Sequence, residues 1–470
     1  MSIVPLLGLG QQGKSSFVTA QRHLNLYAEL PKDGEKGKIA FYGTPGLSLF
    51  SSANGDTPVR GWIQVGSLLY YVHRGTFYQI DNAGTRTSRG TLNTTTGFVD
   101  MAYDGTLILM VDGTNGYTYT IGTTTFAQVS DGDFPNGANT CDWLDGQFIV
   151  DDGDGSDAFY VSPDGTSWDP LDFATAESAP DGLVRVFVDH GQLLLFGEIT
   201  IEPWGTVGGS EFAFAPIKGA IAQFGLAARR SLTPYNDSVA FLGKNAMGQV
   251  QVMMMFGNTP RVISSQEMDY EINSYSSKSD ATAFSYLLGG HPMLQINFPT
   301  PLKSWLYDGS TGMWSPLEYG LNGGRHRAEM HVDFLNRNLV SDYSTGNIYI
   351  LDPDVVTDNG TAIARELITR HLFKGNKRVT IDELYADMEV GVGTSSGQGS
   401  DPQVMLQYSK NNGKTWSAGL WKTLGALGDY ANRVVWRRLG EAYDWLFKLR
   451  ITDPVKVVFV FTDVEGEAER

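Results

Sequence analysis

A short pattern recurs along the first three quarters of this chain: a turn rich in Gly, Asp or Asn is followed at once by an apolar strand. Clear copies are Asp104-Gly-Thr-Leu-Ile-Leu-Met-Val111, Asp145-Gly-Gln-Phe-Ile-Val150 and His190-Gly-Gln-Leu-Leu-Leu-Phe196, and others begin at Gly66, Asn236, Gly290 and Asn336. Successive turns are roughly 40 to 53 residues apart, which is the period of the four-stranded blades of a β-propeller. The repeat therefore predicts a propeller of six or seven blades.

The rest of each repeat agrees with this fold. Several copies continue with a second strand that carries aromatic residues, such as Tyr117-Thr-Tyr119, Trp305-Leu-Tyr307 and Ile348-Tyr-Ile350. A small antiparallel sheet of this kind cannot bury both faces alone, so each blade must be covered by its neighbours. A long solenoid or a pair of sandwiches would also give short strands between turns, and both stay as alternatives at this stage.

The pattern changes after the polar stretch at 354–361. Segments such as Gln403-Val-Met-Leu-Gln-Tyr408 and Lys456-Val-Val-Phe-Val-Phe461 alternate like strands with one buried face. We therefore expect an all-β chain in three parts: an extended N-terminal arm at 1–54, a β-propeller at 55–360 and a C-terminal β-sandwich-like domain at 361–470.

Charge and cysteine content limit the function classes. The net charge is −17. The stretch from Arg365 onward holds 15 basic and 14 acidic residues, so the first 364 residues carry about −18, which opposes phosphate-driven DNA binding. Cys141 is the single cysteine, so an internal disulfide is excluded. No apolar run approaches the roughly 20 residues of a membrane span, and we expect no membrane segment.

The N-terminal stretch Gly8-Leu-Gly-Gln-Gln-Gly13-Lys14-Ser15 fits the P-loop pattern of nucleotide-binding proteins. A P-loop needs a buried parallel strand before it and a helix after it, whereas this chain reads as antiparallel β. We interpret Gly8, Gly10, Gly13 and Lys14 as part of an assembly arm that lies against a neighbouring subunit.

Other candidate chemistry is weak, and we expect neither an enzyme nor a cofactor. The acidic run Asp151–Asp157 is read as a solvated turn, with a structural cation as the alternative. His326 and His331 flank Glu329, but their spacing does not suit joint metal ligation, so we read them as two surface histidines. The hairpin at Ser409-Lys-Asn-Asn-Gly413-Lys-Thr-Trp416 resembles the Asp-box of sialidases, and Ser162-Pro-Asp-Gly165-Thr-Ser-Trp168 is a looser relative. The Asp-box is a turn that stabilises the fold and does not catalyse.

Several segments occur in an order that resembles a known family. They are Asn25-Leu-Tyr-Ala-Glu-Leu-Pro31, Gly43-Thr-Pro-Gly-Leu-Ser-Leu-Phe50, Ala176-Glu-Ser-Ala-Pro-Asp-Gly-Leu-Val-Arg-Val186, Gly197-Glu-Ile-Thr-Ile-Glu-Pro-Trp204, Glu271-Ile-Asn-Ser-Tyr275, Arg433-Val-Val-Trp-Arg-Arg-Leu-Gly440 and Phe447-Lys-Leu-Arg-Ile-Thr-Asp-Pro-Val455. Together they look like the packaged-DNA stabilisation protein, or tail hub, of short-tailed bacteriophages.

The resemblance implies a non-enzymatic virion component, assembled in the host bacterial cytoplasm and present in the tail as a homo-oligomeric ring of six copies. Such a ring would sit below the portal and adaptor rings, close the DNA channel, and anchor the tail needle or tip and the tailspikes or fibres. Genome DNA would pass without sequence-specific binding. The alternative is a glycan-binding or glycan-cleaving propeller, which the Asp-box-like hairpins suggest.

One cluster of basic residues is a candidate subunit contact. The near-neutral C-terminal part carries Arg433, Arg437, Arg438, Lys448 and Arg450 close together in sequence. These residues would suit an acidic neighbouring subunit, or else they are solvated outward positions on alternating strands.

Overall fold

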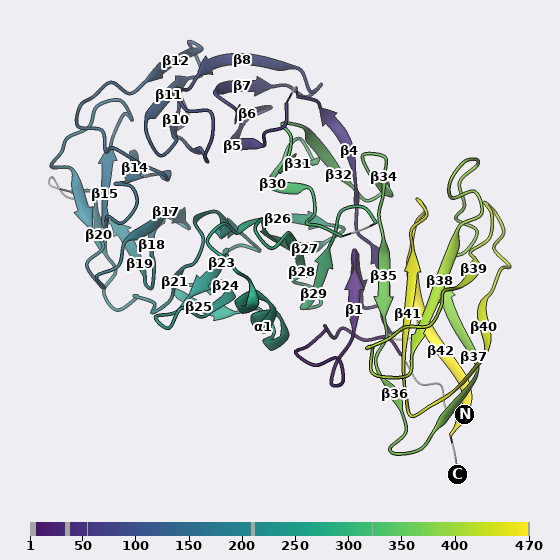
Figure 1. Cartoon of the computed structure of the whole chain (residues 1–470). Helices are drawn as coiled ribbons and strands as arrows, with labels where there is room; N and C mark the ends of the chain where they lie inside the picture. Colours follow the sequence, from purple (N-terminus) through teal and green to yellow (C-terminus); the bar gives the residue numbers. More distant parts are fainter. Residues whose placement is uncertain (1–5, 33–37, 54, 208–211, 322, 469–470) are drawn as a thin grey trace.

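A computed structural model describes residues 6–32, 38–53, 55–207, 212–321 and 323–468 (Figure 1). Within these residues, seven sheets stand around a common centre, and two further sheets lie beside them as a sandwich. Helical structure in the described part is limited to α1 (Gln266–Ser274) and the 3-10 turn η1 (Arg229–Ser231). The predicted propeller followed by a sandwich is confirmed, the blade count is seven, and a solenoid is excluded.

The first four blades are regular four-stranded antiparallel sheets, each formed by consecutive strands. Their strands are β5 (Val59–Val65), β6 (Leu68–His73), β7 (Thr76–Ile80) and β8 (Arg86–Thr91); β9 (Asp100–Tyr103), β10 (Leu107–Val111), β11 (Gly116–Thr120) and β12 (Thr125–Gln128); β13 (Cys141–Leu144), β14 (Gln147–Asp151), β15 (Ala158–Ser162) and β16 (Phe173–Thr175); and β17 (Leu183–Asp189), β18 (Gln192–Gly197), β19 (Ile201–Thr206) and β20 (Phe214–Pro216).

The fifth and seventh blades are less regular, whereas the sixth is again a four-stranded sheet of consecutive strands. Their strands are β21 (Gly225–Leu226), β22 (Thr233–Pro234), β23 (Val239–Lys244), β24 (Val250–Phe256) and β25 (Thr259–Val262); β26 (Thr282–Leu288), β27 (His291–Phe298), β28 (Lys303–Asp308) and β29 (Met313–Leu317); and β30 (Ala328–Asp333), β31 (Asn338–Asp342) and β32 (Ile348–Asp352), extended by β4 (Gly46–Ser51), β33 (Thr357–Asp358) and β34 (Thr361–Ala362).

Five of the seven recurring turns share a backbone conformation that explains their composition, and the turns at Gly66 and Asp104 differ from it. At Asp145–Gly146 both residues have positive φ, +48° and +82°, and the same holds at His190–Gly191. Two consecutive residues with positive φ form the type I′ turn, whose twist matches that of the flanking strands and which favours Gly, Asn and Asp. The repeat found in the sequence is therefore the hairpin between the first two strands of a blade.

The propeller ring is closed by a strand from near the N-terminus. β4 pairs antiparallel with β32, with Leu47 opposite Leu351 and Leu49 opposite Tyr349. Gly46 begins this strand where a Cβ atom would lie 2.5 Å from two backbone oxygens of the 355–357 segment, so only glycine fits there. The last blade thus takes its fourth strand from residues that precede the first blade.

Each pair of neighbouring blades shares its own hydrophobic core. Seven separate clusters of buried residues lie at the seven blade interfaces, including the one where Val59 and Tyr71 of the first blade meet Leu339 and Ile348 of the last. The buried aromatic residues predicted from the repeat lie in these interfaces, where they fill the wedge between blades. An eighth cluster forms the core of the sandwich.

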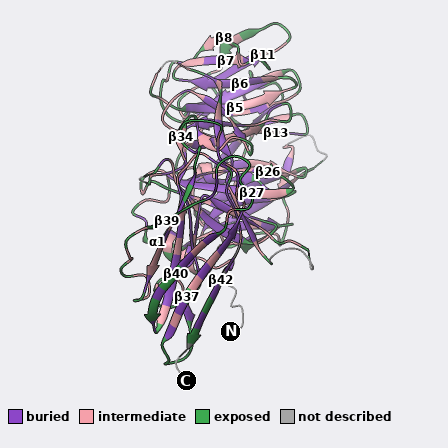
Figure 2. Cartoon of the chain, turned by 90° about the vertical axis from the view of Figure 1, so that its right-hand side faces the viewer, coloured by how far each residue is buried: buried purple, intermediate pink, exposed green. Residues whose placement is uncertain are grey.

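The sandwich draws on both ends of the chain. One sheet has the order β1-β35-β41-β38-β39, with β36 paired to β41, and the other has the order β2-β3-β42-β37-β40. Its strands are β1 (Arg22–Leu24), β2 (Leu26–Glu29), β3 (Ala40–Gly43), β35 (Arg365–Ile368), β36 (Leu372–Phe373), β37 (Val379–Met388), β38 (Gln403–Ser409), β39 (Leu420–Thr423), β40 (Val434–Ala442), β41 (Asp444–Ile451) and β42 (Val458–Ala468). Figure 2 shows buried and exposed residues alternating along β37, β40 and β42.

The N-terminal region differs from the extended arm expected at 1–54. Residues 22–43 form three strands of the sandwich and residues 46–51 complete the last propeller blade. Leu6 and Leu7, which lie before these strands, are 1% and 7% exposed in the sandwich core. The segment is folded because its apolar side chains find partners in residues more than 300 positions away, which local sequence does not reveal.

Asn25 joins the two domains. It lies between β1 and β2 with φ of +52° and is 1% exposed. Its side-chain amide donates to the carbonyl oxygens of Glu318 and Ala364 at 3.0 and 2.8 Å, and its oxygen accepts from the Glu318 N–H at 2.9 Å. One side chain therefore connects the N-terminal strands, the sixth blade and the link to the sandwich.

Candidate functional site

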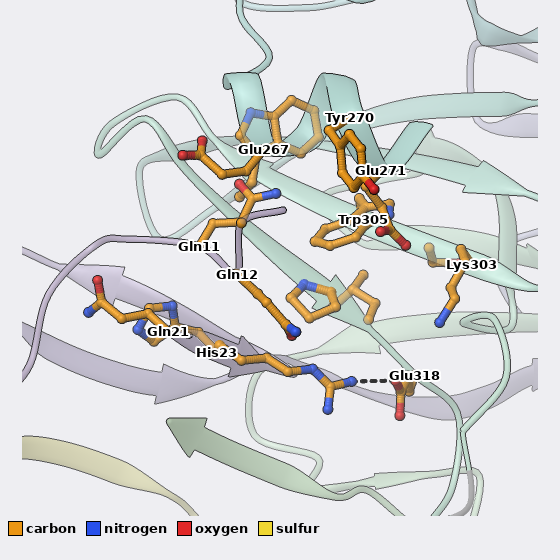
Figure 3. Close-up of a pocket in the computed structure, with 16 residues that line it drawn as sticks. Gln11, Gln12, Gln21, His23, Glu267, Tyr270, Glu271, Lys303, Trp305 and Glu318 are labelled. Atoms are coloured by element: carbon orange, nitrogen blue, oxygen red, sulfur yellow. Dashed lines mark hydrogen bonds and ion pairs between the residues drawn. The ribbon is translucent and has the colours of Figure 1, made fainter. Parts of the chain in front are cut away.

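A cleft of about 320 Å³ opens where the propeller, the sandwich and the N-terminal segment meet (Figure 3). Its three walls are α1, strands β28 and β29 of the sixth blade, and residues 11–13 with 21–23. We treat it as the candidate site because aromatic, acidic and amide side chains from distant parts of the chain converge on it.

The helical wall is acidic and partly aromatic. Ser265 caps α1 by accepting from the Met268 N–H at 3.2 Å, and Met268 and Ile272 bury the inner face of the helix. Glu267, Tyr270 and Glu271 follow at helical spacing and line the cleft, with Tyr270 51% exposed. The ammonium group of Lys14 lies 5.5 Å from the centre of the Tyr270 ring, so the mouth already holds a cation–π contact.

The wall from the sixth blade is held rigidly. The indole N–H of Trp305 donates to the Tyr275 hydroxyl at 2.9 Å, and that of Trp314 donates to the Ile263 carbonyl at 3.1 Å. Both tryptophans therefore keep a fixed orientation along the cleft, while Lys303 lies exposed at its edge. This arrangement offers an aromatic surface whose polar groups are already satisfied.

The N-terminal wall holds two buried polar groups without partners among the described residues. They are Nε2 of Gln21 and Nδ1 of His23, whose residues are 7% and 1% exposed. Burial lowers the pKa of His23 to about 4, against a smaller opposing effect of the Gly8 carbonyl, so the ring is neutral near pH 7. Arg22 between them is fixed by Glu318 at 2.6 Å and Glu366 at 3.2 Å.

The side chains that line the cleft are suited to binding a ligand or a partner. The side chains of Glu267 and Lys303 have no partner in the described part of the chain, and the Glu271 carboxylate accepts from the Tyr275 hydroxyl at 3.3 Å. No group of three or more His, Cys, Asp or Glu residues suited to a metal ion is found in the described ranges. Free carboxylates beside an aromatic wall suit a cationic side chain.

The predicted assembly arm lies against its own chain. Backbone at Leu6 bonds to Arg370, and Gly8 and Gly10 face Arg370 and Gln21 so closely that a Cβ atom would displace those side chains. Gln11 accepts from the Ser265 hydroxyl at 3.2 Å on α1. Because residues 8–15 have neither a strand before them nor a helix after them in the described part, they lack the frame of a P-loop.

The five predicted basic residues do not form one cluster. Arg433, Arg437 and Arg438 lie exposed at β40, at the open edge of one sheet. Lys448 and Arg450 lie on β41 in the other sheet, where Lys448 is 4.2 Å from the Trp416 ring and Arg450 donates to the Leu321 carbonyl at 2.8 Å. Alternation along the sequence could not reveal that the two groups belong to opposite sheets.

The remaining motifs have structural roles. His326 is buried, not at the surface as predicted, because its backbone N–H donates to the Ser304 hydroxyl and its ring contacts Gln295. Asp151, the first residue of the acidic run, is buried and accepts backbone N–H groups of Asn139 and Thr140, whereas the residues after it form a turn with 154–155 exposed, as predicted. Burial raises the pKa of Asp151 to about 6 despite these bonds.

Both Asp-box-like hairpins stabilise turns. The Ser409 hydroxyl accepts from the Gly413 N–H at 2.9 Å, and the Ser162 hydroxyl accepts from the Gly165 N–H at the same distance. The matching geometry supports the structural role expected from the sequence.

A second feature, which the sequence did not suggest, is a group of charged and aromatic side chains towards the centre of the propeller. The Arg230 guanidinium lies 4.5 Å from the Phe98 ring centre, and both residues line each of three hollows, of about 290, 450 and 240 Å³. Ion pairs flank them, with Arg185 3.6 Å from Asp100 and Arg230 3.6 Å from Glu329. The first of these hollows is lined by the opening strands of several blades, so it lies towards the centre of the propeller.

Comparison with known proteins identifies the family of the chain. A family model described as "Bacteriophage P22 Gp10, beta-propeller" matches residues 2–356, and one described as "Bacteriophage P22 Gp10, beta-sandwich" matches residues 364–467. The chain belongs to this Gp10 family. The two matched regions correspond to the propeller and the sandwich, so the resemblance found in the sequence is confirmed.

A curated relative within the Gp10 family is the tail hub protein gp10 of Salmonella phage P22, 25% identical over 316 residues. The match spans 63% of this chain and 64% of the relative's length. Similar solved structures include the WD40 domain of Neurospora crassa Pan2, 8% identical with a TM-score of 0.40 over 66% of this chain and 96% of that one. Another is the designed protein Ika8, 10% identical with a TM-score of 0.42 over 65% and 99%. The chain is thus related to a structural protein of a phage tail.

No helix in the described ranges is long and apolar enough to span a membrane.

Proposed function

We propose that this protein is a hub of a short-tailed bacteriophage tail, in which six copies form a ring below the portal and adaptor rings. The observation that carries this proposal is the family match, which covers both the propeller and the sandwich. The ring would close the DNA channel after packaging, stabilise the packaged DNA and anchor the tail needle or tip and the tailspikes or fibres. Assembly would take place in the host cytoplasm.

The way the two domains are joined supports a load-carrying structural role. Asn25 makes three hydrogen bonds across the junction, Arg22 pairs with Glu318 of the propeller and Glu366 of the sandwich, and Met313 of the sixth blade packs in the sandwich core. Buried polar contacts between well-packed domains resist relative motion. A rigid chain of this kind suits a ring that holds pressurised DNA, and we propose that it acts without catalysis.

The narrow centre of the propeller bears on the path of DNA. Phe98 and Arg230 line hollows of only about 240 to 450 Å³ there, which are too small for a DNA duplex, so DNA would pass through the opening of the ring of copies and not through any single propeller. The first 364 residues carry about −18 charges, so a wall built from them would repel the phosphate backbone and avoid trapping the genome.

Native mass spectrometry of the purified protein, alone and mixed with portal and adaptor rings, tests this proposal. We expect a six-fold complex with the adaptor. A strictly monomeric protein that ignores those rings and retains or hydrolyses surface polysaccharide would refute the hub and favour the glycan alternative.

Particles assembled without this protein give a second test. We expect them to package DNA and then lose it, because the channel below the portal stays open. Full DNA retention in those particles would contradict the closing role.

A further inference from the structure

The two sheets of the sandwich leave an open side, which we call the outer edge: residues 420–423, Tyr430, Arg433, Arg437 and Arg438. β39 is the last strand of one sheet and β40 is the last strand of the other. The indole N–H of Trp436 donates to the Leu420 carbonyl at 3.0 Å, which ties the two edge strands together. Both unpaired edges therefore lie on one surface.

The outer edge is unusually aromatic and basic for a surface. Trp421 and Tyr430 are 55% and 75% exposed, and all four residues of β39 are exposed. Arg437 and Arg438 are both outward although they are consecutive, because a bulge opposite residues 381–383 interrupts the alternation of β40. Trp, Tyr and Arg are the residue types that dominate binding energy at protein interfaces.

A surface of complementary chemistry exists on the propeller. The cleft below α1 presents Glu267 and Glu271 beside Tyr270 and Trp305. Glu267 has no side-chain partner among the described residues. Lys14 lies at the Tyr270 ring, Lys303 lies at the edge of the cleft, and Arg22 is already paired with Glu318 and Glu366. An arginine side chain could stack on the aromatic rings and pair with a carboxylate at the same time.

One chain cannot bring these two surfaces together. In Figure 1, β39 and β40 lie on the side of the sandwich away from the propeller, whereas α1 lies on the propeller, with β41 and β38 between them. Contact between them therefore requires two copies. A contact between different surfaces of identical chains repeats from copy to copy and closes into a ring when the rotation permits.

We propose that the outer edge of one copy docks on the α1 cleft of the next, with Arg433 and Arg438 seated against Glu267 and Glu271. Arg437 pairs with Glu383 of its own chain at 2.8 Å and is not needed for this contact. This inference rests on the proposed ring and names its subunit contact. Aromatic residues of β39 supply the apolar part of the interface, and the opposite charges set its orientation and speed its formation.

Charge reversal tests the pairing in the full-length protein. We expect Arg433→Glu and Glu267→Arg each to lower the ring population at least tenfold, measured by native mass spectrometry at one protein concentration. The double variant should restore it, because the pair is present with signs exchanged. Lys377→Glu is the matched control, since Lys377 is exposed in the same domain but lies outside the outer edge, and it should leave the ring unchanged.

The outcomes separate this inference from the hub proposal. Near-UV circular dichroism of each variant should match the wild type, because the changed side chains are not buried. A wild-type protein that forms no ring would refute the hub itself. Wild-type rings that survive both single variants, or single defects that the double variant does not repair, would leave the hub standing and overturn this contact.

Discussion

Replacing Asn25 by alanine should weaken the whole molecule although it removes only three atoms from each chain. The change breaks three hydrogen bonds, one buried and two partly buried, and leaves the N–H and C=O of Glu318 and the C=O of Ala364 without their partner. At about 1 kcal/mol for each bond, the loss is about 3 kcal/mol. Alanine at a φ of +52° adds about 1 kcal/mol, giving about 4 kcal/mol in the free energy of unfolding.

Two further variants separate these contributions. Asn25→Gly removes the same bonds but tolerates the positive φ, so we expect a loss of about 3 kcal/mol. Asn359→Ala is the matched control, because Asn359 has a φ of +48° but is exposed, and we expect a loss of about 1 kcal/mol.

Urea unfolding followed by tryptophan fluorescence and near-UV circular dichroism measures these losses. Both domains hold tryptophans, so a change at the junction is visible in either. If Asn25→Ala costs no more than Asn359→Ala, the three bonds do not join the domains and the reasoning is refuted.

Two other predictions concern buried groups at the N-terminus and in the sixth and seventh blades. Deleting residues 1–15 removes Leu6 and Leu7 from the sandwich core and should destabilise even a single copy by about 2–5 kcal/mol per leucine, measured by urea unfolding of the monomer. A loss of stability seen only in the ring would show instead that the segment contacts a neighbouring copy. Leu49→Ala, at a 47% exposed site, is the control. Burial holds the pKa of His326 at about 4, below its value of 6.5 in the unfolded chain, so stability should fall as the pH drops from 6.5 to 4. His326→Gln should lose about 3 kcal/mol less over that window, and an unchanged pH profile would refute the burial argument.

The sequence predicts the propeller because its hairpins are local. Asp145–Gly146 and His190–Gly191 adopt the positive φ values that their residue types favour, so the turn, the strands beside it and the repeat all follow from neighbouring residues. The count of seven needed the structure, because the last blade is completed by β4 from before the first. That pairing joins residues about 300 positions apart, and no local pattern encodes it.

The candidate site could be predicted only in part, because most of its residues are far apart in sequence. Glu267, Tyr270 and Glu271 share a helix face, which spacing alone could indicate, but Gln21 and Trp305 reach the cleft only through the fold. The basic residues between 433 and 450 are close together in sequence, which predicts one cluster. They form two groups because β40 and β41 belong to different sheets. The segment beginning at Asn25 is part of the resemblance to the tail-hub family, and the structure shows that Asn25 forms hydrogen bonds at the domain junction.

The strand that closes the last blade and the strands that complete the sandwich come from residues 22–51, while their partners lie at 348–352 and 365–468. During synthesis these early strands must wait for most of the chain before they can pair, since translation supplies their partners last. A prematurely terminated product would lack both closures and keep unpaired strand edges. Completion of the two domains thus depends on the full length of the chain, and in the proposed ring this requirement would exclude truncated copies.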